Sequence, residues 1–175
     1  DLVQISNLTI GYARRHGEQL IAVRDVSLAL PRGETLGVVG ESGCGKSTLG
    51  MAMMGYVRPG SQVLTGNVVI DGSDVFRLTQ RELERLRGGR VGMVSQNAGQ
   101  SLNPTMRVET QLRETLALHA GITGDAATSR ALHLLEQMRL PHPDVLLKRY
   151  PHELSGGQQQ RVAIAMAMAG EPHLL

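Results

Sequence analysis

Residues 40–48 read "GESGCGKST", which matches the pattern G-x-x-x-x-G-K-[ST] at every fixed position. The apolar run "TLGVVG" (35–40) precedes this stretch, and "KSTLGMAMMGYV" (46–57) has a helical pattern after it. A short continuous apolar run is typical of a strand that is buried on both faces. The stretch therefore predicts a glycine-rich turn between a buried strand and a helix, in an α/β fold.

A turn of this kind binds phosphate because glycines let backbone N–H groups converge on an anion, and the helix N-terminus adds positive potential. Lys46 can reach the β- and γ-phosphates of a nucleotide, and the Ser47 hydroxyl is the kind of oxygen ligand that Mg²⁺ prefers. The predicted nucleotide contacts are completed by Gly40, Ser42, Gly43, Cys44, Gly45 and Thr48. The alternative, a plain strand-to-helix turn, is disfavoured because the complete pattern stands in its expected context.

Toward the N-terminus, period-two alternation predicts an antiparallel β-lobe. "LVQISNLTI" (2–10) and "IAVRDVSLAL" (21–30) are predicted strands, joined by the polar turn "GYARRHGEQL" (11–20). The segments beyond the loop are predicted as a strand at "GNVVIDG" (66–72), an amphipathic helix at "TQRELERLRGG" (79–89) and a buried strand at "RVGMVSQ" (90–96).

The C-terminal half of the chain has mostly helical spacing. Residues 107–120 and 125–139 are predicted helices, and "LPHPDVLLKRYPHE" (140–153) is a proline-broken connector. A last helix is predicted from about residue 156 to residue 169. The predicted fold class is therefore α/β: a P-loop NTPase core with an antiparallel β-lobe and a helical lobe.

A second glycine-rich turn, "LSGGQ" (154–158), opens that last helix. Ser155 is well placed as an N-cap, and Gly156 and Gly157 leave amides exposed at the helix start. Alone, such a turn is more often a flexible linker. Here a long apolar helix follows at once in a chain that also carries a P-loop, so the turn predicts a second anion-binding end.

With both turns in view, the sequence resembles the ATP-binding subunits of ABC transporters. Residues 154–158 look like the signature motif of that family, and residues 40–47 look like its Walker A loop. The resemblance implies ATP as the nucleotide and a head-to-tail dimer with a second ABC ATPase domain. In that dimer the signature turn of one domain covers the γ-phosphate held by the other. The residues implied to act in trans are Ser155, Gly156, Gly157 and Gln158.

The same resemblance implies two further site residues. Gln96 matches the Q-loop glutamine, which contacts the metal and senses the γ-phosphate, and Tyr12 falls where the family places an aromatic ring against adenine. The alternative for Tyr12 is a strand-end tyrosine without a ligand. The implied catalytic residues are then Lys46 and Gln96, and the implied Mg²⁺ ligands are Ser47 and Gln96.

A finer resemblance lies in "SLNP" (101–104) and "YPHE" (150–153), which look like the oligopeptide, dipeptide and nickel importer branch. It implies an ATP-hydrolysing subunit that powers import, with peptides as the expected substrates. The implied partners are integral membrane permease subunits and, indirectly, a substrate-binding protein. The implied location is the cytoplasmic face of the membrane, as a peripheral subunit. "SQNAGQ" (95–100) departs from the "FQDP" form usual in the branch.

The family's catalytic carboxylates lie on a strand that follows the signature helix, and "EPHLL" (171–175) looks like the start of that strand. We therefore expect the chain to be truncated before the Walker B motif and, as 175 residues, not to hydrolyse ATP. The expected division is an incomplete ABC ATPase domain: β-lobe and core over about 1–104, helical lobe over about 105–155, and signature helix over 156–175. The alternatives are a non-hydrolysing nucleotide-binding fragment and a soluble ABC protein of DNA repair or translation.

The composition narrows the function classes further. A net charge of +2 and an aromatic content of 2% argue against a nucleic-acid partner, which needs a basic surface or stacking rings. Cys44 is the only cysteine, so neither an intrachain disulfide nor a cysteine metal cluster can form. Its position within the loop is more simply explained as a tolerated small residue than as a redox centre. No apolar run reaches membrane-spanning length.

Overall fold

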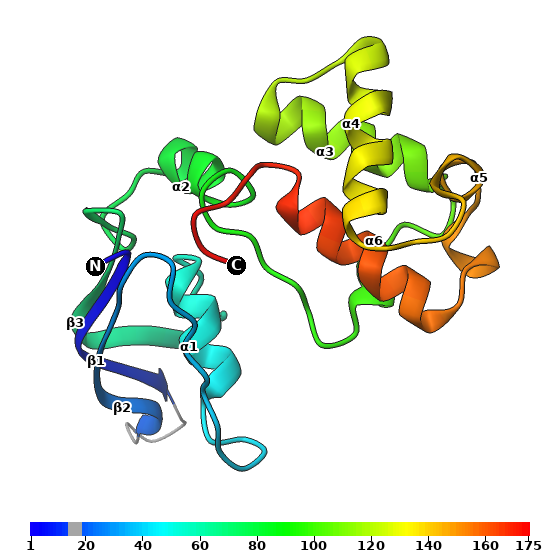
Figure 1. The fold of residues 1–175 in the computed structure, drawn as a ribbon. Helices are drawn as coiled ribbons and strands as arrows, with labels where there is room; N and C mark the ends of the chain where they lie inside the picture. The colour runs from blue at the N-terminus through cyan, green and yellow to red at the C-terminus, as the bar shows by residue number, and fades with distance from the viewer. Residues whose placement is uncertain (14–18) are drawn as a thin grey trace. The chain divides into compact units, whose positions relative to one another are not determined.

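The computed structural model describes residues 1–13 and 19–175, with Ala98 described by its backbone alone. The chain divides into two compact units, Asp1–Glu84 and Arg85–Leu175. Each unit has its own secondary structure, coloured from blue to green and from green to red in Figure 1. The finer division at residues 104 and 155 stays a prediction. The centre of the predicted hairpin turn, residues 14–18, lies outside the described residues.

The first unit is built on an antiparallel sheet, as the alternating pattern predicts. Among the described residues its strands are arranged in the order β2-β1-β3-β4, and every pairing is antiparallel. The strands are β1 (Val3–Ala13), β2 (Gln19–Leu30), β3 (Ser61–Ile70) and β4 (Ser73–Asp74). The sheet confirms the predicted β-lobe, because residues 2–10 and 21–30 form its two longest strands.

A bulge interrupts the alternation along β1. Val3 and Ile5 are buried, and the next buried side chains are Leu8 and Ile10, so the spacing is three residues across the middle of the strand. Asn7 lies between the two pairs with a left-handed φ of 48°, where the register with both neighbouring strands shifts. The extra residue keeps the apolar side chains on one face of the sheet on both sides of the bulge.

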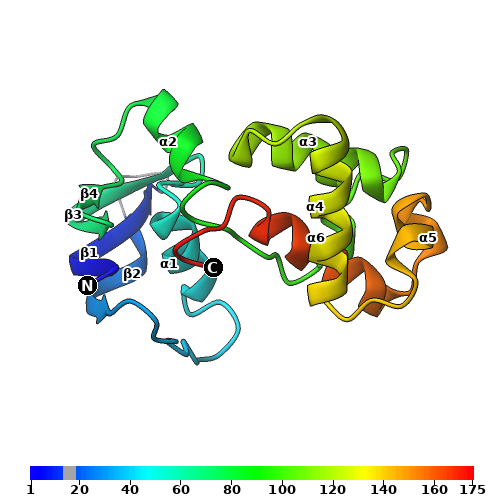
Figure 2. The same ribbon diagram turned by 45° about the horizontal axis from the view of Figure 1, so that its top comes forward.

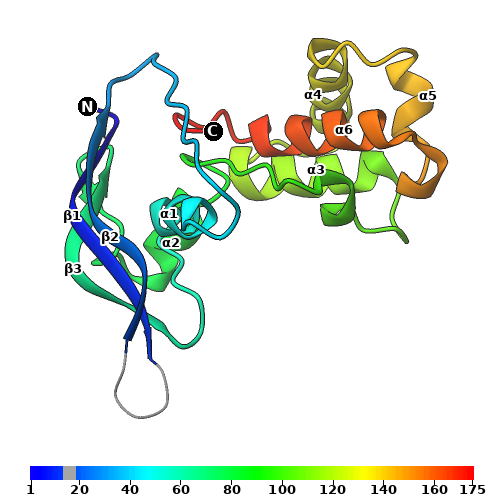
Figure 3. The same ribbon diagram turned by 90° about the horizontal axis from the view of Figure 1, so that it is seen from below.

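Helix α1 (Lys46–Met53) packs against the sheet through Leu49 and Ala52, which are buried (Figure 3). The helix is shorter than the sequence predicts, because Gly55 follows in a left-handed conformation with a φ of 62°. A Cβ at Gly55 would lie 2.5 Å from Cδ2 of Leu83, so the chain turns here against helix α2 (Gln80–Leu86).

The prediction of a buried strand at residues 35–40 is wrong. The segment has no regular secondary structure, and Leu36, Val38 and Val39 are 47%, 47% and 92% exposed. A strand needs a neighbour for its backbone N–H and C=O groups, and in the described part of the chain no strand pairs with this segment. The apolar composition of residues 35–40 would suit a strand buried between two others, but these residues do not form one here.

The second unit is helical, which confirms the predicted helical character of residues 105–155 and of the last helix. Its helices are α3 (Val108–Ala120), α4 (Gly124–Gln137), α5 (Pro143–Leu147) and α6 (Gly156–Met168), all labelled in Figure 2. Two 3₁₀ turns, η1 (Ala98–Ser101) and η2 (Pro151–Glu153), belong to the same unit. The boundary between the two units falls inside helix α2 (Gln80–Leu86), which precedes these elements in the sequence. The predicted connector contains α5, which begins at a proline, a residue that suits the first helical position.

Helices α3, α4 and α6 enclose one apolar core. Helix α4 crosses α6, as Figures 1 and 3 show from two directions. The side chains at the centre of this core include Leu112, Leu116, Leu134, Leu135 and Val162, none more than 1% exposed. Of the helices in the described residues, none combines the length and the hydrophobicity needed to span a membrane.

The strand predicted at residues 90–96 is reduced to a short contact. Val91 forms isolated parallel bridges with Arg87 and Leu174. The N–H of Gly92 donates to the Leu174 carbonyl at 2.8 Å, while Met93 is 53% exposed. The predicted strand start "EPHLL" therefore contacts the predicted strand "RVGMVSQ", but a continuous ladder does not form between the described residues.

A buried glutamine fixes the loop between η1 and α3. Gln111 is 5% exposed, the one polar residue in the buried set of the described chain. Its Oε1 accepts from the Asn103 N–H at 2.9 Å, and its Nε2 donates to the carbonyls of Asn103 and Met106 at 3.1 and 3.0 Å. The "SLNP" stretch thus takes its shape from a satisfied side-chain amide on α3.

Candidate functional site

The glycine-rich loop of residues 40–48 turns tightly against β2. Gly43 and Gly45 have left-handed φ angles of 83° and 98°, which glycine adopts without steric cost. A Cβ at Gly45 would lie 2.2 Å from the Ala22 carbonyl oxygen, whereas a Cβ at Gly43 would meet nothing within 4 Å. Glycine is therefore needed at 45 for close approach to β2, and at 43 for the backbone conformation alone.

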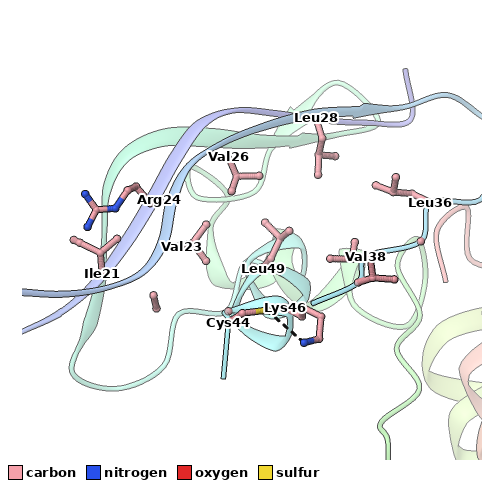
Figure 4. Close-up of a pocket in the computed structure, with 14 residues that line it drawn as sticks. Ile21, Val23, Arg24, Val26, Leu28, Leu36, Val38, Cys44, Lys46 and Leu49 are labelled. Atoms are coloured by element: carbon pink, nitrogen blue, oxygen red, sulfur yellow. Dashed lines mark hydrogen bonds between the residues drawn. The ribbon is translucent and has the colours of Figure 1, made fainter. Parts of the chain in front are cut away.

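The Lys46 ammonium lies over the loop. Its Nζ donates to the carbonyl oxygens of Gly40 at 2.7 Å and Glu41 at 2.6 Å. It also donates to Sγ of Cys44 at 3.4 Å, the bond drawn in Figure 4. Helix α1 begins at Lys46, and its N-cap, Gly45, has no side chain to bond the first amides. The loop therefore combines a cation, a helix N-terminus without a side-chain cap and two left-handed glycines, a geometry that fits a phosphate group.

The other predicted residues of the first unit lie in this loop, at the start of α1 and near the end of β1. Ser42 and Ser47 are exposed, and Thr48 is half-buried in the first turn of α1. Tyr12 is half-buried near the end of β1, where it pairs with Leu20 of β2 and Ser61 of β3. The side chain of Ser47 is thus accessible to a metal ion, and the role of Tyr12 stays a prediction.

An apolar pocket of about 600 Å³ adjoins the loop, and the sequence did not predict it. Figure 4 shows Val23, Val26 and Leu28 of β2 on one side, and Leu36 and Val38 on the other. The signal for it was present, since alternate residues of β2 are apolar and the run before the loop is continuously apolar. Each feature alone indicates a strand, and the sequence does not show that the two segments form two walls of one pocket.

The signature turn of the second unit is a capped helix N-terminus. The Ser155 Oγ accepts from the Gln158 N–H at 3.3 Å, and the Gln158 Oε1 accepts from the Ser155 N–H at 2.9 Å. This reciprocal capping box confirms the predicted N-cap and also occupies the Gln158 side chain. A Cβ at Gly156 or Gly157 would meet nothing within 4 Å, so the space above the first turn of α6 is open.

Gln96 lies close to the signature helix, a proximity that the sequence did not predict. It is exposed and lines a pocket of about 340 Å³ together with residues from η1 and from the start of α6. The other lining residues are Asn97, Gly99, Gln100, Gly156, Gln159 and Gln160. The sequence signal for this pocket is the run of three glutamines at 158–160, of which Gln159 and Gln160 line it.

The predicted metal ligands Ser47 and Gln96 belong to different units. Within residues 1–13 and 19–175, the structure holds no group of three or more His, Cys, Asp or Glu side chains placed to bind a metal ion. By contrast, the residues predicted to act in trans, 155–158, are contiguous at the N-terminus of α6.

The chain matches a family model described as "ABC transporter" over residues 23–175. It is 41% identical over 175 residues to the oligopeptide transport ATP-binding protein OppD of Bacillus subtilis, which covers 99% of this chain and 49% of that protein. It is 40% identical over 181 residues to the glutathione import ATP-binding protein GsiA of Salmonella paratyphi A, which covers 100% of this chain and 29% of that protein. The chain thus spans about half the length, or less, of these curated relatives.

The fold is shared with solved ABC cassettes. The structure superposes on the ATP-binding cassette MJ0796, solved as a dimer in a post-hydrolysis state bound to ADP and Pi, with a TM-score of 0.81 and 31% identity. The likeness covers 97% of this chain and 70% of that one, and it confirms the predicted α/β fold class. The family match, the curated relatives and the shared fold agree: the chain belongs to the ABC transporter family.

Proposed function

We propose that the chain is the ATP-binding part of an energy-coupling ATPase subunit that powers an ABC importer of peptides. The observation that carries the proposal is the loop in which the Lys46 ammonium bonds the Gly40 and Glu41 carbonyls beside the uncapped N-terminus of α1. The capped turn at Ser155 adds the second helix end that the signature motif requires. The named activities of the relatives, oligopeptide transport and glutathione import, support peptides as the substrate class.

In this proposal the loop holds the phosphates of ATP. The Lys46 ammonium exchanges the carbonyls of Gly40 and Glu41 for β- and γ-phosphate oxygens, and backbone amides from Gly43 to Thr48 donate to the same phosphates. Mg²⁺, when bound, neutralises phosphate charge; Ser47 and Gln96 would hold it. Tyr12 would stack on the adenine ring.

The second half of the site would come from a second ABC ATPase domain. Ser155, Gly156 and Gly157 would face the γ-phosphate of the nucleotide bound by the partner domain, with the open space above the glycines admitting it. Gln158 would act by fixing Ser155 through the capping box. The dimeric form of the MJ0796 cassette supports this arrangement.

The remaining partners follow from the importer assignment. We propose permease subunits in the membrane, a substrate-binding protein acting through them, and a peripheral position on the cytoplasmic face. Nucleic acid is not a proposed partner. The division of the chain into a core over about 1–104, a helical lobe over about 105–155 and the signature helix over 156–175 belongs to the same proposal.

The experiment that tests the proposal uses the natural full-length polypeptide, whose intact mass is measured first against the 18.9 kDa of these residues. ATP binding and ATP hydrolysis are then compared with those of Lys46→Ala, and co-purifying proteins are identified. We expect Lys46-dependent binding and turnover, with membrane subunits in the complex. Binding without turnover supports the non-hydrolysing alternative, and capture of ribosomes or DNA in place of membrane subunits overturns the importer assignment.

A further inference from the structure

The 3₁₀ turn η1 follows Gln96 and packs against the N-terminal part of α6. A side chain at Gly99 in η1 would displace the Gln159 side chain, because a Cβ there would lie 2.2 Å from Oε1 and 3.2 Å from Cβ of Gln159. Gly99 is not among the glycines with a positive φ, so alanine suits its backbone conformation. A methyl group at this position would therefore meet the Gln159 side chain first.

The same side chain holds the segment that leads into Ser155. The Gln159 Nε2 donates to the carbonyl of Pro151 at 2.7 Å and to the carbonyl of Leu154 at 3.3 Å. The Gln159 N–H also donates to the Ser155 carbonyl at 2.9 Å. Leu154 immediately precedes Ser155, so the side-chain amide of Gln159 fixes the backbone that leads into the signature turn.

We infer that Gln159 is a positioning residue that couples the segment after Gln96 to the signature turn at Ser155. One half-buried side chain contacts Gly99 on one side and holds the Pro151 and Leu154 carbonyls on the other. A displacement of η1 toward α6 moves the Gln159 amide off these carbonyls and loosens the turn. The functional consequence rests on the proposed function, in which Gln96 and Ser155 serve two different nucleotides.

A double-mutant cycle in the natural full-length polypeptide tests this coupling. The methyl group of Gly99→Ala displaces the Gln159 amide, and Gln159→Ala removes it, so both variants release the same carbonyls. Hydrogen–deuterium exchange by mass spectrometry reports on the amides of residues 153–159. We expect each single variant to raise exchange there by about fivefold, and the double variant to exchange no faster than Gln159→Ala.

Two further variants separate coupling from packing and from general destabilisation. Gln159→Met keeps the side-chain volume beside Gly99 but loses both donated hydrogen bonds, so its exchange at 153–159 should match that of Gln159→Ala. Gln137→Ala changes an exposed glutamine on α4 of the same unit and should leave this exchange unchanged. The coupling would be overturned if the exchange increases of the two single variants multiplied in the double variant. It would also be overturned if Gly99→Ala exchanged at the wild-type rate at residues 153–159.

Turnover gives a second readout. If the proposed function holds, Gly99→Ala and Gln159→Ala should lower kcat for ATP by a similar factor, leave ATP affinity at the Walker A loop unchanged, and show no additive loss when combined. A loss of ATP affinity in Gln159→Ala would contradict the inference. If the wild-type polypeptide neither binds nor hydrolyses ATP, the proposed function fails, while the exchange cycle still decides whether Gln159 couples the two segments.

Discussion

Asn103 and Gln111 exchange two hydrogen bonds: the Asn103 N–H donates to Oε1 of Gln111, and Nε2 of Gln111 donates to the Asn103 carbonyl. With its further bond to the Met106 carbonyl, the Gln111 amide satisfies three backbone groups of one loop from a position that is almost fully buried. The loop after Gln96 is thereby anchored to α3 at one end, while η1 contacts α6 at the other.

Gln111→Leu should lower the free energy of unfolding of the helical unit by at least about 2 kcal/mol, because three backbone groups lose their partner in a buried place. Urea denaturation followed by the helical circular dichroism signal measures it. The control is Gln137→Leu, at an exposed site on α4, where we expect a change within about 0.5 kcal/mol. Equal effects in the two variants would contradict the anchoring role of Gln111.

Gly43 and Gly45 form a matched pair, since both have a left-handed φ but only Gly45 contacts β2. Gly43→Ala should cost about 1 kcal/mol of stability from backbone strain, and Gly45→Ala more than about 2 kcal/mol, because its methyl also meets the Ala22 carbonyl. Thermal unfolding of the two variants under identical conditions gives the comparison. A Gly45→Ala variant as stable as Gly43→Ala would rule out the close approach to β2.

Lys46→Ala should weaken ATP binding by at least tenfold, as expected for the loss of a charge-assisted contact to phosphate of about 1.4 kcal/mol or more. Stability should change little, because within residues 1–13 and 19–175 the ammonium bonds to the carbonyls and the thiol of its own loop. Titration calorimetry measures the affinity. Arg58→Ala, which removes an exposed cation of the same unit, is the control for net charge and should bind ATP normally.

Ser155→Ala should cost about 1 kcal/mol of stability, because the Gln158 N–H loses its capping partner at the start of α6. Ser155→Thr keeps the hydroxyl and should recover most of that loss. Chemical denaturation of the three proteins decides it, and an alanine variant as stable as wild type would contradict the capping role. ATP affinity at the Walker A loop should be the same in all three, since Ser155 is proposed to act on the nucleotide of a partner domain.

Helix caps and helix bounds were the features that the sequence predicted best. The N-cap at Ser155 follows from a Ser before a Gly-Gly pair and a long apolar helix, and the structure has the predicted hydrogen bond. The helix predicted at 107–120 begins one residue later and ends at Ala120. In both cases the residues that determine the element lie within a few positions of it in the sequence.

The features that depend on residues far apart in the sequence were harder to predict. The apolar run at 35–40 was predicted as a buried strand, but a strand exists only where another one pairs with it, and composition cannot supply the neighbour. Gly99 and Gln159 lie side by side although they are sixty residues apart in the sequence. No hydrophobic periodicity in the sequence indicates that these two positions meet. The Gln111 anchor was missed for a related reason, since a lone glutamine on a helix is usually exposed.

Cys44, the only cysteine in the chain, has an exposed thiol whose sulfur accepts a hydrogen bond from the Lys46 ammonium at 3.4 Å. Cyanylation of this thiol would install a small infrared probe at one defined place, with no engineered cysteine. The nitrile stretching frequency responds to nearby charge, so withdrawal of the Lys46 ammonium toward an arriving phosphate would shift the band. The loop thus offers its own spectroscopic reporter of occupancy, readable in solution as nucleotide is added.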